Sequence, residues 1–144
     1  MLRTILTVRI IAGTTLLLSA AALPGCGKGV YPVEGQVVWK DGSPAKELAG
    51  SLVTFENTEK GVSCVGNIRP DGSFRLTTTN PDDGAFAGDY HVAIQENRPN
   101  ADGTGTRLMP ARLDERYRDL KGSGLAATVK PGKNSVKLEV DRAK

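Results

Sequence analysis

The sequence predicts an all-β domain, a sandwich of seven strands that follows an N-terminal export signal. From Tyr31 onward, short apolar stretches alternate with turn residues about every 8 to 12 positions, which is typical of a β-sandwich. No stretch of this part shows the period of an amphipathic helix. The seven strands also contain nearly all the aromatic and branched side chains of the domain.

The first strand is expected over residues 33–40, and the second over residues 51–56. Side chains alternate between the two faces of a strand, so one face of the first strand collects Val33, Gly35, Val37 and Trp39. Asp41-Gly42 tolerates the positive φ of a tight turn, and Pro44 lacks the N–H that a central strand needs. In the second strand, Val53 and Phe55 are expected to face the core.

The third and fourth strands are predicted to form a hairpin. The third covers residues 63–68, and the turn at Asp71-Gly72 leads into the fourth, where Phe74, Leu76 and Thr78 share a face.

The fifth strand follows the glycine-containing connection 84–89, and Tyr90, Val92 and Ile94 take its core face. The position of Tyr90, just after Gly88, predicts a tyrosine corner, in which the hydroxyl bonds the backbone. Residues 125–129 and 136–140 complete the domain as a second hairpin around the turn 130–134.

Residues 97–123 form a long loop that does not fit a core strand. Its first part, up to Thr106, is rich in Asn, Gly, Asp and Thr. Its second part is expected to pack against the sandwich, with at most a helical turn near residues 113–120. The apolar residues of this second part are Leu108, Met109, Leu113, Tyr117 and Leu120.

Residues 1–25 have the order of an export signal. Arg3 and Arg9 are followed by the apolar run 10–23, which has the length of a secretory signal and is too short to cross a bilayer. Leu23-Pro24-Gly25-Cys26 resembles the lipobox of bacterial lipoproteins, although Pro24 departs from the usual small residue. Cleavage between Gly25 and Cys26 and acylation of the Cys26 thiol, with palmitate-type chains, are therefore expected.

Two other interpretations of this segment stay open. Ala20-Ala21-Ala22 could serve as a site for ordinary signal peptidase, which would release a protein that keeps Cys26 as a thiol. The segment could also remain uncleaved as a short anchor.

Charge and cysteine content agree with an exported domain. The chain has 19 basic and 16 acidic residues, and loss of Arg3 and Arg9 with the signal lowers the net charge from +3 to +1. No basic run reaches five residues, so nucleic acid is not an expected partner. If Cys26 is acylated, Cys64 has no intramolecular disulfide partner and is expected to be a small buried hydrophobe.

Several segments together resemble a carboxypeptidase regulatory-like domain of transthyretin-like fold. They are residues 33–37, 41–44, 70–74, 88–92 and 129–134, within a match that covers 31–141. The chain is similar to small bacterial lipoproteins that carry this single domain, which also show a Pro-x-x-Tyr-type segment, here 110–117, before a Ser-Gly-Leu strand, here 123–125. The resemblance implies a seven-stranded Greek-key sandwich, behind a tether of residues 26–30, and says little about activity.

No residue pattern indicates an enzyme, a metal site or a cofactor. His91, the single histidine, is expected to point outward, and one histidine cannot form a multi-histidine zinc site. The acidic loop 80–84 lacks the spacing of an EF-hand, so its aspartates are expected to form turns. Gly132, flanked by Lys130 and Lys133, is explained by a turn rather than an anion nest.

The densest charged segment lies before residue 123, and it offers a candidate contact surface for an envelope protein or polysaccharide. The residues proposed for it are Arg112, Arg116 and Tyr117. A solvated charged face is the plainer explanation, and a structural role for Tyr117 would show as a loss of stability in Tyr117→Ala.

The leading functional hypothesis is a non-enzymatic, lipid-anchored cell-envelope protein that binds or organises a partner at the membrane. Gly27 follows the anchor cysteine without an acidic retention signal, which favours the outer membrane. The alternatives are a carbohydrate-binding module, with Tyr31, Phe86 and Tyr117 as stacking candidates, and a hydrolase of transthyretin-related fold.

Overall fold

The computed structural model describes residues 29–101, 103–105 and 107–144, and within them the chain forms nine strands and two short 3-10 helices. The all-β prediction is confirmed. In chain order the elements are β1 (Val30–Tyr31), β2 (Val33–Trp39), η1 (Lys46–Leu48), β3 (Leu52–Asn57), β4 (Val62–Asn67), β5 (Ser73–Arg75), β6 (Ala85–Phe86), β7 (Gly88–Gln95), η2 (Glu115–Arg118), β8 (Leu125–Val129) and β9 (Asn134–Val140).

The described strands form three sheets. One has the order β4-β3-β7-β8 with antiparallel pairs, and the second has the order β5-β2-β9, with β2 and β9 parallel. The third is the pair β1-β6. Seven of the strands overlap the seven predicted ones, although β5 ends at Arg75 and is shorter than the predicted fourth strand. β1 and β6 were not predicted because two residues are too short for alternation to be recognised.

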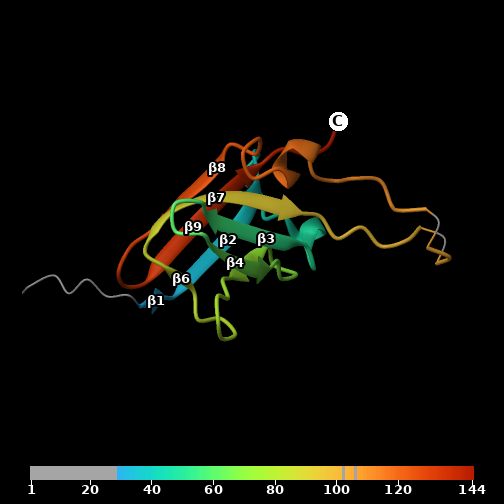
Figure 1. Cartoon of the computed structure of the whole chain (residues 1–144). Helices are drawn as coiled ribbons and strands as arrows, with labels where there is room; N and C mark the ends of the chain where they lie inside the picture. Colours follow the sequence, from blue (N-terminus) through green and yellow to red (C-terminus); the bar gives the residue numbers. More distant parts are fainter. Residues whose placement is uncertain (1–28, 102, 106) are drawn as a thin grey trace, which may run out of the picture.

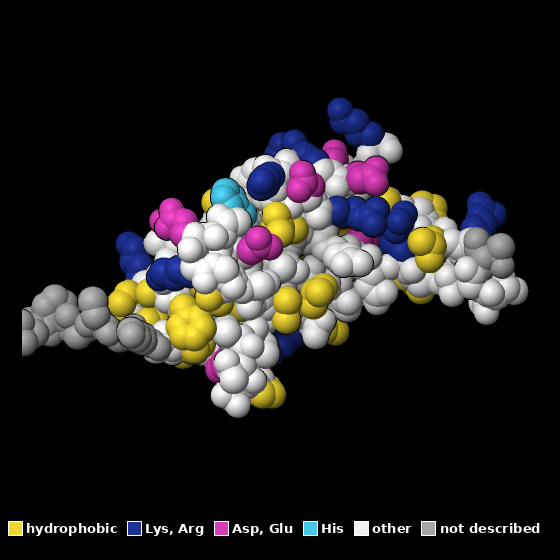
Figure 2. All heavy atoms as spheres, in the orientation of Figure 1, with side chains coloured by type: hydrophobic (Ala, Val, Ile, Leu, Met, Phe, Trp, Pro, Cys, Tyr) yellow, Lys and Arg dark blue, Asp and Glu magenta, His cyan; other side chains and the backbone are white. Residues whose placement is uncertain are grey.

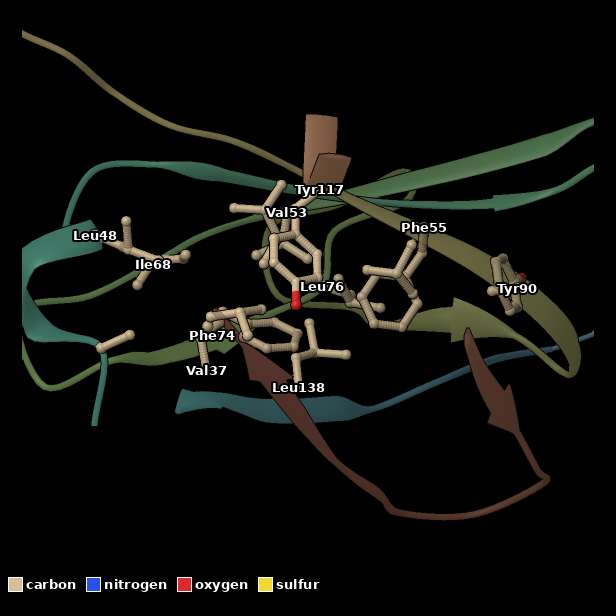
Figure 3. Packing of buried hydrophobic residues seen from close by; sticks show 14 of the residues in the cluster. Val37, Leu48, Val53, Phe55, Ile68, Phe74, Leu76, Tyr90, Tyr117 and Leu138 are labelled. Carbon is tan, nitrogen blue, oxygen red and sulfur yellow. The ribbon is translucent and has the colours of Figure 1, made fainter. Parts of the chain in front are cut away.

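The core lies between the two larger sheets (Figure 3). Val53 and Phe55 of β3 are fully buried, as the alternation predicted, and the Phe55 ring lies 6.0 Å from that of Phe74. Gly35 of β2 makes room for this packing, because a Cβ there would lie 2.1 Å from the Phe74 ring. Tyr90, Val92 and Ile94 are buried as well, so the predicted core faces of the second and fifth strands are confirmed.

The predicted hairpin between the third and fourth strands is formed only in part. β4 pairs with β3 and β5 pairs with β2, so the turn at Asp71 carries the chain from one sheet to the other. A single antiparallel bridge, Val65 to Thr77, joins the two segments. The Asp71 carboxylate accepts a hydrogen bond from Ser73 N at 2.9 Å, which stabilises the predicted turn. This local bond does not determine which strand β5 pairs with.

The predicted hairpin at the end of the domain is wrong. β8 pairs with β7, whereas β9 crosses to the other sheet and lies parallel to β2. The turn between them is held by the Asn134 side chain, which bonds Lys130 N and the carbonyls of Lys130 and Gly132, each at 2.9 Å. The turn was predicted at the correct place, but the strand after it, β9, pairs with β2 rather than with β8.

The predicted tyrosine corner is present at Tyr90. Its ring is buried beside Phe55, with a centroid distance of 6.1 Å, and its hydroxyl donates to the Phe86 carbonyl at 2.9 Å. Burial raises the pKa of Tyr90 to about 12. This bond fixes the short strand β6 onto the main sandwich.

The described part of the molecule has two distinct ends (Figure 1). β1, β6 and the turn between β8 and β9 lie at the end where the described chain begins. Residues 97–101, 103–105 and 107–111 project from the opposite end, close to η2. We call this projecting segment the arm.

Candidate functional site

The predicted lipidation and cleavage positions, Cys26 and Gly25, lie outside the described residues. They therefore stay predictions. Over the part of the chain that the structure covers, no helix is long and apolar enough to span a membrane.

The arm is a narrow loop whose two halves bond mainly to each other. Ala101 N donates to the Arg107 carbonyl at 2.7 Å, and Met109 N donates to the Pro99 carbonyl at 3.0 Å. Leu108 and Met109 are 51% and 42% exposed. The expectation that these two side chains pack against the sandwich is therefore wrong, because the arm lies away from it (Figure 1).

A buried carboxylate holds the base of the arm. The Glu96 side chain is only 5% exposed, and it accepts bonds from Arg112 N at 3.0 and 3.1 Å and forms an ion pair with Arg112 Nε at 3.2 Å. Arg112 Nη1 also donates to the Glu47 carbonyl at 2.6 Å. Arg112 thus lies at the surface, as a contact residue would, but its guanidinium is already engaged within the chain.

Tyr117 lies in the core rather than on an exposed contact face. Its ring is 2% exposed, and its hydroxyl donates to Asp141 Oδ2 at 3.1 Å while it accepts from Asp141 N at 3.1 Å. Asp114 caps η2 by accepting from Arg116 N at 3.1 Å, which sets the direction of this turn. Leu113 is buried as well, so this part of the predicted packing is confirmed.

Arg116 is exposed but lies over the Tyr117 ring, with 4.7 Å from its guanidinium carbon to the centroid, and it forms an ion pair with Asp141. Lys40 also bonds Asp141, at 2.8 Å. The pKa of Asp141 is lowered, chiefly by the hydrogen bond from Lys40. Of the three predicted contact residues, the structure therefore brings Arg116 and Tyr117 together. All three side chains have hydrogen-bond or ion-pair partners within the chain.

A groove of about 470 Å³ lies at the base of the arm. Its apolar wall comes from Leu108, Ala111 and Leu113, and charged side chains surround it. These charged residues are Glu96, Arg98, Asp114, Glu115, Arg118 and Lys144. An apolar wall inside a charged rim suits a short peptide segment better than a single small polar ligand.

Arg98 and Lys144 are the cations of this groove that make no ion pair within the described residues. Figure 2 shows lysine and arginine side chains gathered where the arm leaves the sandwich. Sequence reasoning missed Arg98, Leu108 and Lys144 as site residues, because they come from distant parts of the chain. One sequence feature could have indicated this groove: the apolar pair Leu108-Met109 lies within a polar segment that has neither the strand nor the helix period.

The chemically reactive residues do not form a cluster. His91 is exposed on β7, as predicted. Cys64 is buried, and burial raises its pKa to about 11, which agrees with the role of a small hydrophobe. No group of three or more His, Cys, Asp and Glu side chains that could hold a metal occurs among the residues the structure describes.

The acidic loop 80–84 is a turn, as expected. The Asp83 carboxylate accepts hydrogen bonds from Thr78 N, Thr79 N and Asn80 N at 2.7, 3.0 and 2.7 Å. These bonds from N–H groups use the oxygens that a cation would need. The nearby Asp82 pairs with Arg69 at 3.4 Å.

The three aromatic residues considered for stacking on sugars do not form one platform. Tyr117 is buried near η2, whereas Tyr31 and Phe86 are half-buried in the paired strands β1 and β6. A carbohydrate site would therefore need aromatic groups other than this set.

Comparisons of the chain with family models, with curated proteins and with solved structures give no match. The resemblance to carboxypeptidase regulatory-like domains thus depends on the sequence motifs alone, and the functional argument depends on the chain's own residues.

Proposed function

We propose that the protein is a non-enzymatic, lipid-anchored β-sandwich of the cell envelope that presents the arm and its groove to a partner protein. The observation that carries this proposal is the placement of two features at opposite ends. The described chain begins beside β1, three residues after the predicted lipidation site, and the arm projects from the far end (Figure 1). A lipid on Cys26 would therefore leave the arm facing away from the membrane.

The resemblance to transthyretin-like domains is part of the proposal. The seven longer strands divide into a three-stranded and a four-stranded sheet, which supports a sandwich of this type, and β1-β6 is an addition to it. On this basis a Greek-key arrangement and an accessory, binding role are inferred by analogy.

The arm supports binding more than catalysis. Its Leu108 and Met109 are exposed, and Leu108 lines the groove together with Arg98, which has no ion pair among the described residues. Methionine and arginine side chains are both enriched at protein interfaces. An envelope protein is therefore favoured over a polysaccharide, and outer-membrane attachment is favoured because Gly27 carries no acidic retention signal.

We expect Cys26→Ala to abolish membrane attachment by lipid. The wild-type protein should fractionate with membranes and have the intact mass of a chain that starts at Cys26 and carries acyl groups, because two chains give stable anchoring where one does not. The Cys26→Ala protein should lack that mass. A wild type that is soluble and cleaved after Ala22 would overturn the proposal.

The arm can be tested separately in membrane-bound protein. A photoreactive side chain in place of Met109 should give one discrete crosslinked adduct that disappears when Leu108 is changed to Ser. The same group in place of Thr128, an exposed residue of β8, serves as the control and should give none. Equal crosslinking at both positions, or none at Met109, would remove the arm as the contact surface.

A further inference from the structure

We propose that the end of the sandwich formed by β1, β6 and the turn between β8 and β9 docks on the headgroups of anionic phospholipids. We call it the tether end, and define it by Val30, Tyr31, Phe86, Lys60 and the turn residues 130–133. The inference rests on the proposed lipid anchor at Cys26 and adds the face and the chemistry with which the domain meets the bilayer.

Backbone and side-chain bonds bring these segments to one place. Val30 and Phe86 are paired across the strands β1 and β6. Lys60, from the turn between β3 and β4, donates through Nζ to the Ala87 carbonyl at 2.5 Å, directly after Phe86. Lys60 is thus held next to the paired strands β1 and β6, which carry Tyr31 and Phe86.

The turn between β8 and β9 joins the same end. Asn134 N donates to the Pro32 carbonyl at 3.0 Å, immediately after β1. Lys130 and Lys133 are exposed on this turn, and Figure 1 shows the turn on the side where the described chain begins.

The tether end combines cations with half-buried apolar groups. Its lysines are Lys60, Lys130 and Lys133. The acidic groups nearby are Glu59, Asp89, which accepts a bond from Thr128 Oγ1 at 2.6 Å, and Asp83, which precedes Gly84 beside the Tyr31 carbonyl and accepts three backbone N–H bonds. The tether itself adds Lys28. Tyr31 and Phe86 are half-buried, and Figure 2 shows hydrophobic side chains beside the start of the described chain, with lysine or arginine groups near them.

This composition matches a membrane interface. Aromatic rings are enriched at the level of the headgroups, and lysines are attracted to anionic lipid surfaces. The arm end also carries cations: Arg112 and Arg116 are held in ion pairs with Glu96 and Asp141, whereas Arg98 and Lys144 have no ion pair among the described residues. Charge alone therefore does not distinguish the two ends, and the choice between them rests on the tether.

The length of the tether selects this end over any other. Only Gly27, Lys28 and Gly29 separate Cys26 from Val30, so the four steps between them span at most about 14 Å when fully extended. The headgroup layer is itself roughly 5 to 8 Å thick on each side of the hydrocarbon. A lipid on Cys26 therefore holds β1 at or just above the headgroups.

Fluorescence quenching tests this orientation. Lipidated Phe86→Trp protein is placed in vesicles of phosphatidylcholine and phosphatidylglycerol that contain brominated acyl chains, with lipidated Leu108→Trp as the matched control at the arm. The native Trp39 is 1% exposed and gives the same background in both. Quenching is expected for Phe86→Trp and not for Leu108→Trp. Equal quenching of the two, or none for Phe86→Trp, would overturn the inference.

A charge test addresses the lipid class. Adding Lys130→Gln and Lys133→Gln to the Phe86→Trp protein should shift the balance between docked and free orientations by about fivefold per lysine in phosphatidylglycerol vesicles. The control pair Lys46→Gln and Lys121→Gln removes the same charge from exposed positions outside the tether end and should change nothing. An equal effect of both pairs would contradict recognition of anionic headgroups by this face.

The two proposals fail in different ways. A protein whose intact mass shows no lipid on Cys26 would overturn the proposed function and this inference with it. A protein that is lipidated, but whose Phe86→Trp variant is not quenched, would overturn only the docking of the tether end.

Discussion

Tyr117→Ala is expected to lower the free energy of unfolding by about 3 to 5 kcal/mol, because it removes a fully buried aromatic ring from the core. The ring is 2% exposed and belongs to the same buried cluster as Leu113 and Leu138. The substitution also removes the hydroxyl that bonds Asp141 at 3.1 Å. Urea unfolding followed by Trp39 fluorescence measures the change.

The matched control is Tyr117→Phe, which keeps the ring and removes only the hydroxyl. Its expected cost is about 1.5 to 3 kcal/mol, the usual size for loss of a hydrogen bond that has a charged partner. If Tyr117→Ala left the unfolding midpoint unchanged, the ring would not be part of the core, and its interpretation as an exposed contact group would return.

Glu96→Ala is expected to destabilise the protein by about 3 kcal/mol, because it leaves Arg112 N and the Arg112 guanidinium without their carboxylate partner. Glu96 is buried and Arg112 is about one-third exposed, so solvent replaces part of the loss. The measurement is again urea unfolding, together with proteolysis of the arm, which should become faster once its base is released.

Glu115→Ala provides the control for this prediction. Glu115 also lines the groove, but its side chain is 87% exposed and its ion pair with Arg118 is long, at 3.4 Å. Its loss should leave stability and arm cleavage unchanged. Equal behaviour of the two variants would show that the base of the arm is not held by Glu96.

The faces of the strands could be predicted from the sequence, because alternation is a local property. Val53 and Phe55 were expected in the core and are fully buried. Strand partners could not be predicted in the same way. The turns at Asp71 and at Asn134 are stabilised by their own side chains, and such local bonds specify that the chain bends without specifying which strand it will meet.

The candidate site was harder to predict than the fold. The contact residues proposed from the sequence were chosen for charge density, yet Arg112, Arg116 and Tyr117 all have partners within the chain. Leu113 and Leu108 are both apolar residues of the same polar segment, but Leu113 is 2% exposed and Leu108 is 51% exposed. Their difference arises from tertiary position, which a segment without periodicity does not reveal.

The parallel pairing of β2 with β9 has a consequence for when the domain can fold. β2 is the first long strand of the described chain and β9 the last, with Val33 opposite Asn134 and Trp39 opposite Val140. The three-stranded sheet therefore cannot close until the ribosome has released almost the entire domain, and contacts of such long sequence separation form slowly. If the proposed export takes place, late closure of this sheet would keep the chain unfolded during secretion, and the sandwich would form only after the chain has crossed the membrane.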